Sequence, residues 1–89
     1  MKKEIISSET KKPISFEMID ITLQTRANFT DAYYEADNST PQKLSLWINC
    51  IKIVTTMSDE EILQLTDLEI VQVAVECLIE MSNKKKLKK

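Results

Sequence analysis

The chain has 89 residues and a formal net charge of −2, and it contains no histidine, no glycine and two cysteines. Without histidine it lacks the usual general base near neutral pH and the commonest metal ligand, and without glycine it lacks the loops that cradle phosphates. We therefore expect a protein that is not an enzyme and has no catalytic residue, no cofactor and no metal site.

No apolar run reaches the roughly 18 to 20 residues that cross a bilayer, and the charged N-terminal residues lack the apolar centre of a signal peptide. Cys50 and Cys77 lie singly within apolar helical patterns, which predicts buried free thiols in a reducing compartment. We expect a cytoplasmic protein that does not bind a membrane.

The lysines are concentrated at the two ends of the chain. Residues 13 to 83 hold three cations against twelve carboxylates, a balance of −9 that would repel the phosphates of nucleic acid. We predict a flexible N-terminal arm at residues 1 to 12, a single helical domain at residues 13 to 83 and a basic C-terminal tail at residues 84 to 89. A core built from roughly 65 residues is marginal, so partner binding or self-association as a homo-oligomer is expected to add stability.

The first element predicted along the chain is a short strand at residues 14 to 21. Ile14, Phe16 and Met18 alternate with polar side chains, and the alternation slips by one residue after Met18, which suggests a bulge. The alternative is an extended segment that packs on helices without pairing to another strand.

A first helix is predicted from about Thr22 to Asp37, because uncharged residues return at helical spacing while the charged residues lie mostly elsewhere. The uncharged residues are Leu23, Ala27, Thr30, Tyr33 and Tyr34. A second helix, apolar over much of its girth, is predicted from Thr40 as N-cap and Pro41 as first helical residue to about Thr56.

Two capping boxes follow. Ser58 with Glu61 predicts the start of a short helix, and Thr66 with Glu69 predicts the start of a last helix at residues 67 to 82. In the last helix we expect Leu68, Val71, Val75, Leu78 and Ile79 to face inward and Glu69, Gln72, Glu76 and Glu80 to face solvent.

These elements predict an all-α or mainly α fold: a small bundle of three to four helices with a short N-terminal strand. The absence of glycine disfavours hairpins, since every tight turn must be built from Asn, Asp, Ser or Pro. We expect the protein to bind another protein through apolar and aromatic side chains that a domain of this size leaves half covered. Helical geometry places six residues at such positions: Tyr33, Tyr34, Leu46, Ile53, Ile70 and Val73.

Two segments and their order carry a family resemblance. The segment ITLQTRANFTDAYYEA is followed by an apolar helix and then by the acidic, capped segment MSDEEILQLTDLEIVQVAVECL. This layout, over residues 19 to 82, resembles the tail assembly chaperones of long-tailed, siphovirus-like bacteriophages and prophages. The resemblance implies a non-enzymatic protein of the host cytoplasm that binds the tape measure protein, with the tail tube protein as a second partner. It would keep the tape measure protein soluble during virion assembly.

Two other classes stay open. An acidic phage or mobile-element inhibitor that mimics nucleic acid or blocks a host enzyme predicts carboxylates clustered on one face, whereas a chaperone predicts an exposed apolar strip. A small helix-turn-helix regulator is the third class, but its candidate recognition helix at residues 67 to 82 has no cation to contact a phosphate.

Overall fold

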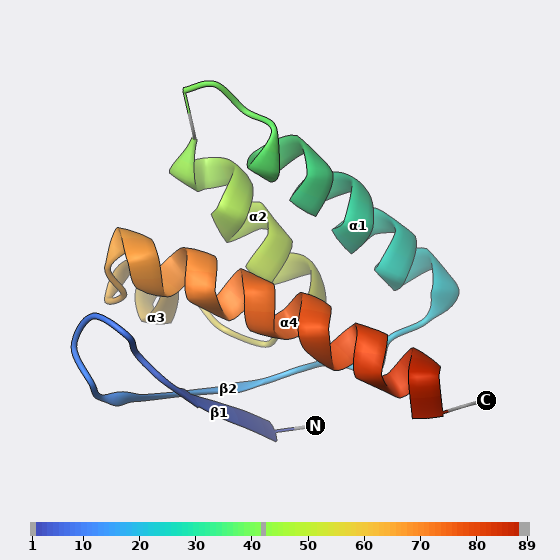
Figure 1. Ribbon diagram of the computed structural model, residues 1–89, viewed down its shortest axis with the longest axis horizontal. Coiled ribbons are helices and arrows are strands. Elements are labelled where there is room, and N and C mark those ends of the chain that lie inside the picture. The colour runs from blue at the N-terminus through green and yellow to red at the C-terminus, as the bar shows by residue number, and fades with distance from the viewer. Residues whose placement is uncertain (1, 42, 88–89) are drawn as a thin grey trace.

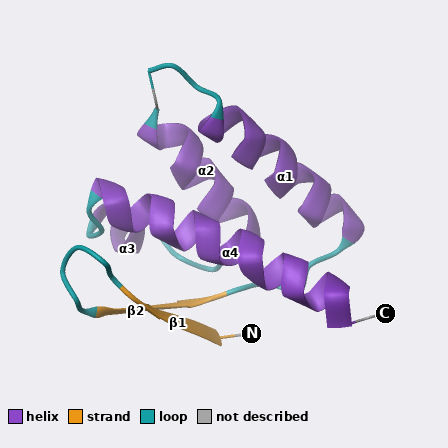
Figure 2. Ribbon diagram, viewed as in Figure 1, coloured by secondary structure: helices purple, strands orange, loops and turns teal. Residues whose placement is uncertain are grey.

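The computed structural model describes residues 2–41 and 43–87, with side chains to residue 82. Six elements lie in this part of the chain: β1 (Lys2–Ile6), β2 (Pro13–Glu17), α1 (Leu23–Asp37), α2 (Leu44–Val54), α3 (Asp59–Leu63) and α4 (Asp67–Leu87). The described chain is therefore mainly helical, with one two-stranded antiparallel sheet, as Figures 1 and 2 show. Helix α1 packs against α2, and α2 packs against α4. Within the described residues, no helix combines the length and apolar character needed to cross a membrane.

The N-terminal residues form a strand, so the predicted flexible arm at residues 1 to 12 is wrong for the described residues 2 to 12. Strand β1 pairs with β2 in a register that sets Ile5 opposite Ile14 and Lys3 opposite Phe16. Ile5 is buried in the same core as Ile14 and Phe16. The sequence of β1 shows no clear alternation of apolar and polar residues, because Ile5 is its only buried apolar side chain. Alternation is recognisable only over several residues.

The hairpin loop is built without glycine because a lysine takes the required backbone conformation. The amide of Ser7 donates to the carbonyl of Lys12 at 2.9 Å, and the amide of Lys11 donates to the carbonyl of Ser7 at 3.0 Å. Lys11 has a φ of 62°, in the left-handed region that ordinary residues occupy at a cost. The expectation that only Asn, Asp, Ser and Pro would form the turns is therefore wrong here.

The predicted strand near residue 14 is confirmed over Pro13–Glu17, and its pairing continues beyond the hairpin. Met18 forms an isolated bridge with Thr55, in the connection after α2. The amide of Thr56 donates to the carbonyl of Glu17, and the amide of Ile19 donates to that of Val54, both at 2.9 Å. This connection thus lies against the outer edge of β2.

Helix α1 matches its prediction, whereas α2 begins later than predicted. Thr22 is the N-cap of α1, and its side chain accepts from the amide of Thr25. Helix α2 has Lys43 at its N-cap without a side-chain hydrogen bond, so the prediction of Thr40 as N-cap and Pro41 as first helical residue is wrong. The carbonyl of Pro41 instead accepts from the hydroxyl of Ser39 at 2.8 Å, within the connection between the helices.

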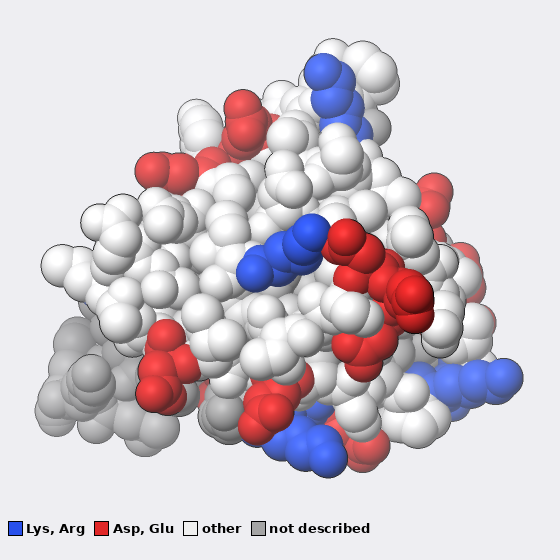
Figure 3. All heavy atoms as spheres, turned by 180° about the vertical axis from the view of Figure 1, so that it is seen from behind, with Lys and Arg blue, Asp and Glu red and all other residues white. Residues whose placement is uncertain are grey.

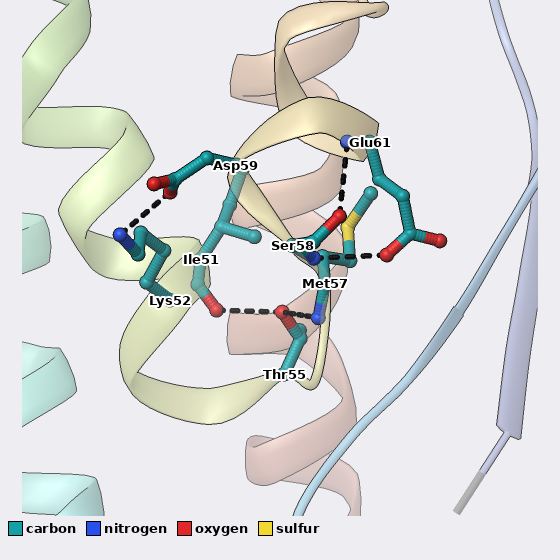
Figure 4. Close-up of polar contacts among 7 residues, drawn as sticks. All are labelled: Ile51, Lys52, Thr55, Met57, Ser58, Asp59 and Glu61. Atoms are coloured by element: carbon teal, nitrogen blue, oxygen red, sulfur yellow. Dashed lines mark hydrogen bonds and ion pairs between the residues drawn. The ribbon is translucent and has the colours of Figure 1, made fainter.

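Both predicted capping boxes are confirmed. In α3, Ser58 accepts from the amide of Glu61 at 3.2 Å, while the Glu61 carboxylate accepts from the amide of Ser58 at 2.8 Å, as Figure 4 shows. The same reciprocal bonds join Thr66 and Glu69 at the start of α4, at 3.2 and 2.9 Å. Helix α4 continues to Leu87, so it includes part of the predicted basic tail. The side chains from residue 83 onward, and residues 88–89 entirely, lie outside the described part.

Helix α4 is rotated relative to its prediction. Its buried side chains are Glu69, Ile70, Val73, Ala74, Cys77 and Met81. The stripe predicted to face inward is instead half buried or exposed, and Leu68 and Ile79 are its most exposed members. The polar edge predicted to face solvent is instead buried or half buried, and it contacts the hairpin. It consists of Glu69, Gln72, Glu76 and Glu80.

Four side chains of α4 hold the hairpin. The Gln72 amide donates to the carbonyl of Ile6 at 2.7 Å and accepts from the amide of Ser8 at 3.2 Å. The ammonium of Lys3 lies 3.7 Å from the Glu76 carboxylate and 3.3 Å from that of Glu80. Gln72 thus binds the edge of the hairpin much as a neighbouring strand would.

Glu69 is the most heavily bonded of the four. Besides the amide of Thr66, its carboxylate accepts from the hydroxyl of Thr10 at 2.8 Å, and it bonds the hydroxyl of Ser7, which is fully buried. These bonds, with Ser7 the largest contributor, lower the pKa of Glu69 from 4.5 to about 2. One carboxylate therefore caps α4 and fastens the hairpin loop to it.

Acid should weaken the fold through Glu69. Because its folded pKa lies below the ordinary value, the carboxylate stabilises the fold fully above about pH 4.5 and loses this effect as the pH falls towards 2. We expect Glu69→Gln to lower the free energy of unfolding at pH 7. We also expect this free energy to fall less steeply between pH 4.5 and 2.5, with a slope that is smaller by up to the contribution of about one bound proton. Urea unfolding at a series of pH values measures both. Glu61→Gln, which makes the same change in the exposed capping box of α3, is the matched control. An equal effect from it would contradict the role given to Glu69.

The hairpin loop gives a second prediction. Lys11→Gly should raise the free energy of unfolding by about 0.5 to 1 kcal/mol, because glycine adopts positive φ without the steric cost, and this gain exceeds its added entropy in the unfolded chain. Lys12→Gly is the control and should not stabilise the protein, since Lys12 does not have a positive φ. Urea unfolding of the full chain compares the two. No change in Lys11→Gly would mean that the loop is not held in this conformation.

Candidate protein-binding surface

The structure separates the six residues predicted to bind a partner. Tyr34 is 71% exposed on α1, whereas Ile70 and Val73 on α4 are 2% and 0% exposed. The prediction that Ile70 and Val73 are only half covered is therefore wrong, because the rotation of α4 turns both into the core. Leu46 and Ile53 are half buried and pack against the core. They are seven residues apart, which places them on the same side of α2.

Tyr33 belongs to an aromatic cluster rather than to an open surface. Its ring centroid lies 5.8 Å from that of Phe29 and 5.1 Å from that of Trp47, and the Trp47 contact is perpendicular. Such edge-to-face contacts stabilise aromatic pairs beyond their buried area. Burial, followed by the charge of Asp37, raises the pKa of the Tyr33 hydroxyl. The cluster joins α1 to α2 and leaves Tyr34, the next residue, pointing elsewhere.

The main apolar surface of α4 lies on the stripe that the sequence assigned to the core. We call it the α4 stripe; it consists of Leu68, Val71, Val75, Leu78 and Ile79. Leu68 is 62% exposed and Ile79 is 43% exposed, while the three residues between them are half buried. Their spacing of three and four residues makes one continuous surface along the helix. Val71 and Leu78 also pack against the core, so the position of this surface is fixed by core contacts.

Helix α1 has a second exposed stripe, which is less continuous and also consists of residues whose spacing predicted the helix. The α1 stripe consists of Leu23, Ala27, Thr30 and Tyr34, all of them exposed. All four residues share one face of the helix, opposite the buried Phe29 and Ala36. The periodicity therefore identified the helix correctly, but Phe29, Ala32, Tyr33 and Ala36 are the residues that contact the core.

The two thiols do not form a reactive site. Cys50 on α2 and Cys77 on α4 are free and buried, as predicted. Burial is the main cause that raises the pKa of Cys50 to about 11 and that of Cys77 to about 12. Both are thus protonated near neutral pH, and a protonated thiol is a poor nucleophile and a poor metal ligand. No cluster of potential metal ligands occurs among the residues that the structure describes.

The acidic side chains are distributed unevenly. On the face drawn in Figure 3, they lie in several groups separated by neutral surface, and the largest group adjoins a basic side chain. Part of the charge is paired: Lys52 lies 2.6 Å from Asp59, and Lys3 lies close to Glu76 and Glu80. Exposed pairs of this kind contribute little to stability, but they reduce the local negative potential.

The arrangement provides exposed apolar helix surfaces on an acidic domain. Comparisons with protein families, with curated proteins and with solved structures find no match to this chain.

Proposed function

We propose that this chain is a non-enzymatic protein-binding domain, a small helical bundle braced by a hairpin, that acts as a tail assembly chaperone of a long-tailed phage or prophage. Its client is the tape measure protein, which it keeps soluble in the host cytoplasm until the tail is assembled. The α4 stripe is the observation that supports binding to a protein, and the resemblance over residues 19 to 82 supports the choice of client.

The α4 stripe suits a helical client. An amphipathic helix binds through apolar residues repeated at three and four positions, and a continuous row of half-covered Val, Leu and Ile side chains is complementary to such a surface. Leu68 and Ile79 are eleven residues apart, which corresponds to about three helical turns. Exposed apolar rows of this kind are unusual on proteins that act alone.

The negative charge of the domain suits the same role. Residues 13 to 83 have a balance of −9, and net charge of one sign keeps a complex soluble while apolar surfaces are covered. The α1 stripe offers a second contact, with Tyr34 as its largest side chain. Phage tail assembly also predicts a genomic neighbourhood: a tape measure gene immediately downstream and a tube gene upstream.

Removing the apolar side chains of the α4 stripe should abolish the chaperone activity. The double variant Leu68→Gln with Ile79→Gln replaces the two exposed residues and should change stability by less than about 1 kcal/mol, because both substitutions are at the surface. We expect the tape measure protein encoded in the same genome to be soluble when co-expressed with the natural chain and insoluble with this variant. Sedimentation of the lysate and quantification of both proteins measure the result.

The control removes two exposed isoleucines elsewhere. Ile6→Gln with Ile19→Gln changes side chains of the N-terminal segment, at 58% and 37% exposure, and should leave the client soluble. Client solubility that does not depend on this chain would contradict the proposal. Equal loss in both double variants would mean that the α4 stripe is not the specific contact.

A further inference from the structure

The outer edge of β2 is only partly paired. The carbonyl of Glu17 and the amide of Ile19 point towards the connection after α2, where they bond Thr56 and Val54. In an antiparallel ladder, alternate residues direct their amide and carbonyl groups to the same edge. The amide and carbonyl of Ser15 and the carbonyl of Pro13 therefore point the same way. Among the described residues no backbone partner reaches them, because the chain turns away at Ser58 into α3.

A groove of about 500 Å³ lies along this free part of the edge. One wall is the strand from Pro13 to Ser15, and the other is formed by the connection from α3 to α4, including Leu65. Met57 and Leu65, both half buried, contribute apolar surface to it. The volume is within the range of about 300 to 1,000 Å³ that binding sites occupy.

The charged groups of the groove are not equivalent. The carboxylates of Glu61 and Glu69 already accept from the amides of Ser58 and Thr66 in the two capping boxes. Figure 4 shows the Glu61 side chain extending from α3 on the side of the strands. The ammonium of Lys12, in contrast, has no carboxylate of the described residues within ion-pair distance. Among the described residues, the groups left without a partner here are thus the Lys12 ammonium, the amide of Ser15 and the carbonyls of Ser15 and Pro13.

We propose that this groove binds an extended polypeptide segment of a partner protein, which adds to the edge of β2 as a further antiparallel strand. An extended backbone is the ligand whose amides and carbonyls alternate at the spacing that Pro13 and Ser15 present. The incoming strand continues the row of edge hydrogen bonds begun by Val54 and Thr56. It places an apolar side chain against Met57 and Leu65 and an acidic side chain beside Lys12. This site is distinct from the α4 stripe and does not depend on the proposed chaperone role.

The amide of Ser15 is the group that a test can remove without disturbing the hairpin. Ser15→Pro eliminates this donor, and proline is tolerated in an edge strand where the amide faces outward. Ser15→Ala keeps the amide and is the matched control, since both variants lose the hydrogen bond from the Ser15 hydroxyl to Glu4. In the free protein the Ser15 amide should exchange its hydrogen rapidly, whereas the amides of Ile14 and Phe16, which face β1, should be protected.

The probe is a library of random nine-residue peptides, selected on the immobilised full chain, from which the most enriched peptide is synthesised and titrated into the isotope-labelled protein. We expect a strand-forming peptide with one acidic side chain, placed beside Lys12, that shifts the NMR signals of Lys12 to Ser15 and of Leu65 and protects the Ser15 amide from exchange. Affinity should fall about tenfold or more in Ser15→Pro and stay within about twofold in Ser15→Ala.

Three results would overturn the proposal: no peptide enriched above background, an enriched peptide that leaves the Ser15 amide unprotected, or one whose shifts fall on the α4 stripe. The exchange measurement uses the natural chain, so it decides the matter even if Ser15→Pro does not fold. Failure of this test would leave the α4 stripe and its client untouched.

Discussion

The polar contacts between the hairpin and α4 determine how the rest of the molecule is arranged. Glu69 caps α4 and accepts from Ser7 and Thr10, and Gln72 pairs with the hairpin edge at Ile6. A buried carboxylate is stable only with its hydrogen bonds complete, so this edge of α4 must face the hairpin loop. With that edge fixed, Ile70 and Val73 turn into the core and Leu68 turns outward.

The exposed apolar surface follows from this rotation. Helix α4 has two apolar stripes, and a core of this size can cover only one of them fully. The contacts with the hairpin place the stripe that includes Ile70 and Val73 in the core, and the α4 stripe stays at the surface. Helix α1 shows the same division, because Phe29 and Tyr33 join Trp47 in the core while Leu23 and Tyr34 stay exposed. Contiguous exposed apolar surface is a general mark of interaction sites.

The two candidate contacts use different physical chemistry. The α4 stripe offers side-chain surface to a helix, whereas the edge of β2 offers backbone hydrogen bonds to an extended segment. They also lie on different elements of the fold, α4 and β2. Linked contacts raise affinity without requiring either one to be strong.

The sequence alone determined the features that depend on neighbours along the chain. Both capping boxes, helix α1, the strand after Pro13 and the burial of both cysteines were predicted, because caps and periodicity act over three to five residues. Strand β1 was not, since its one fully buried isoleucine makes no recognisable pattern. Only the tertiary structure decided which stripe of α4 is buried. Periodicity defines the faces of a helix, but the choice between two apolar faces rests on distant partners, here Ser7, Thr10 and the carbonyl of Ile6.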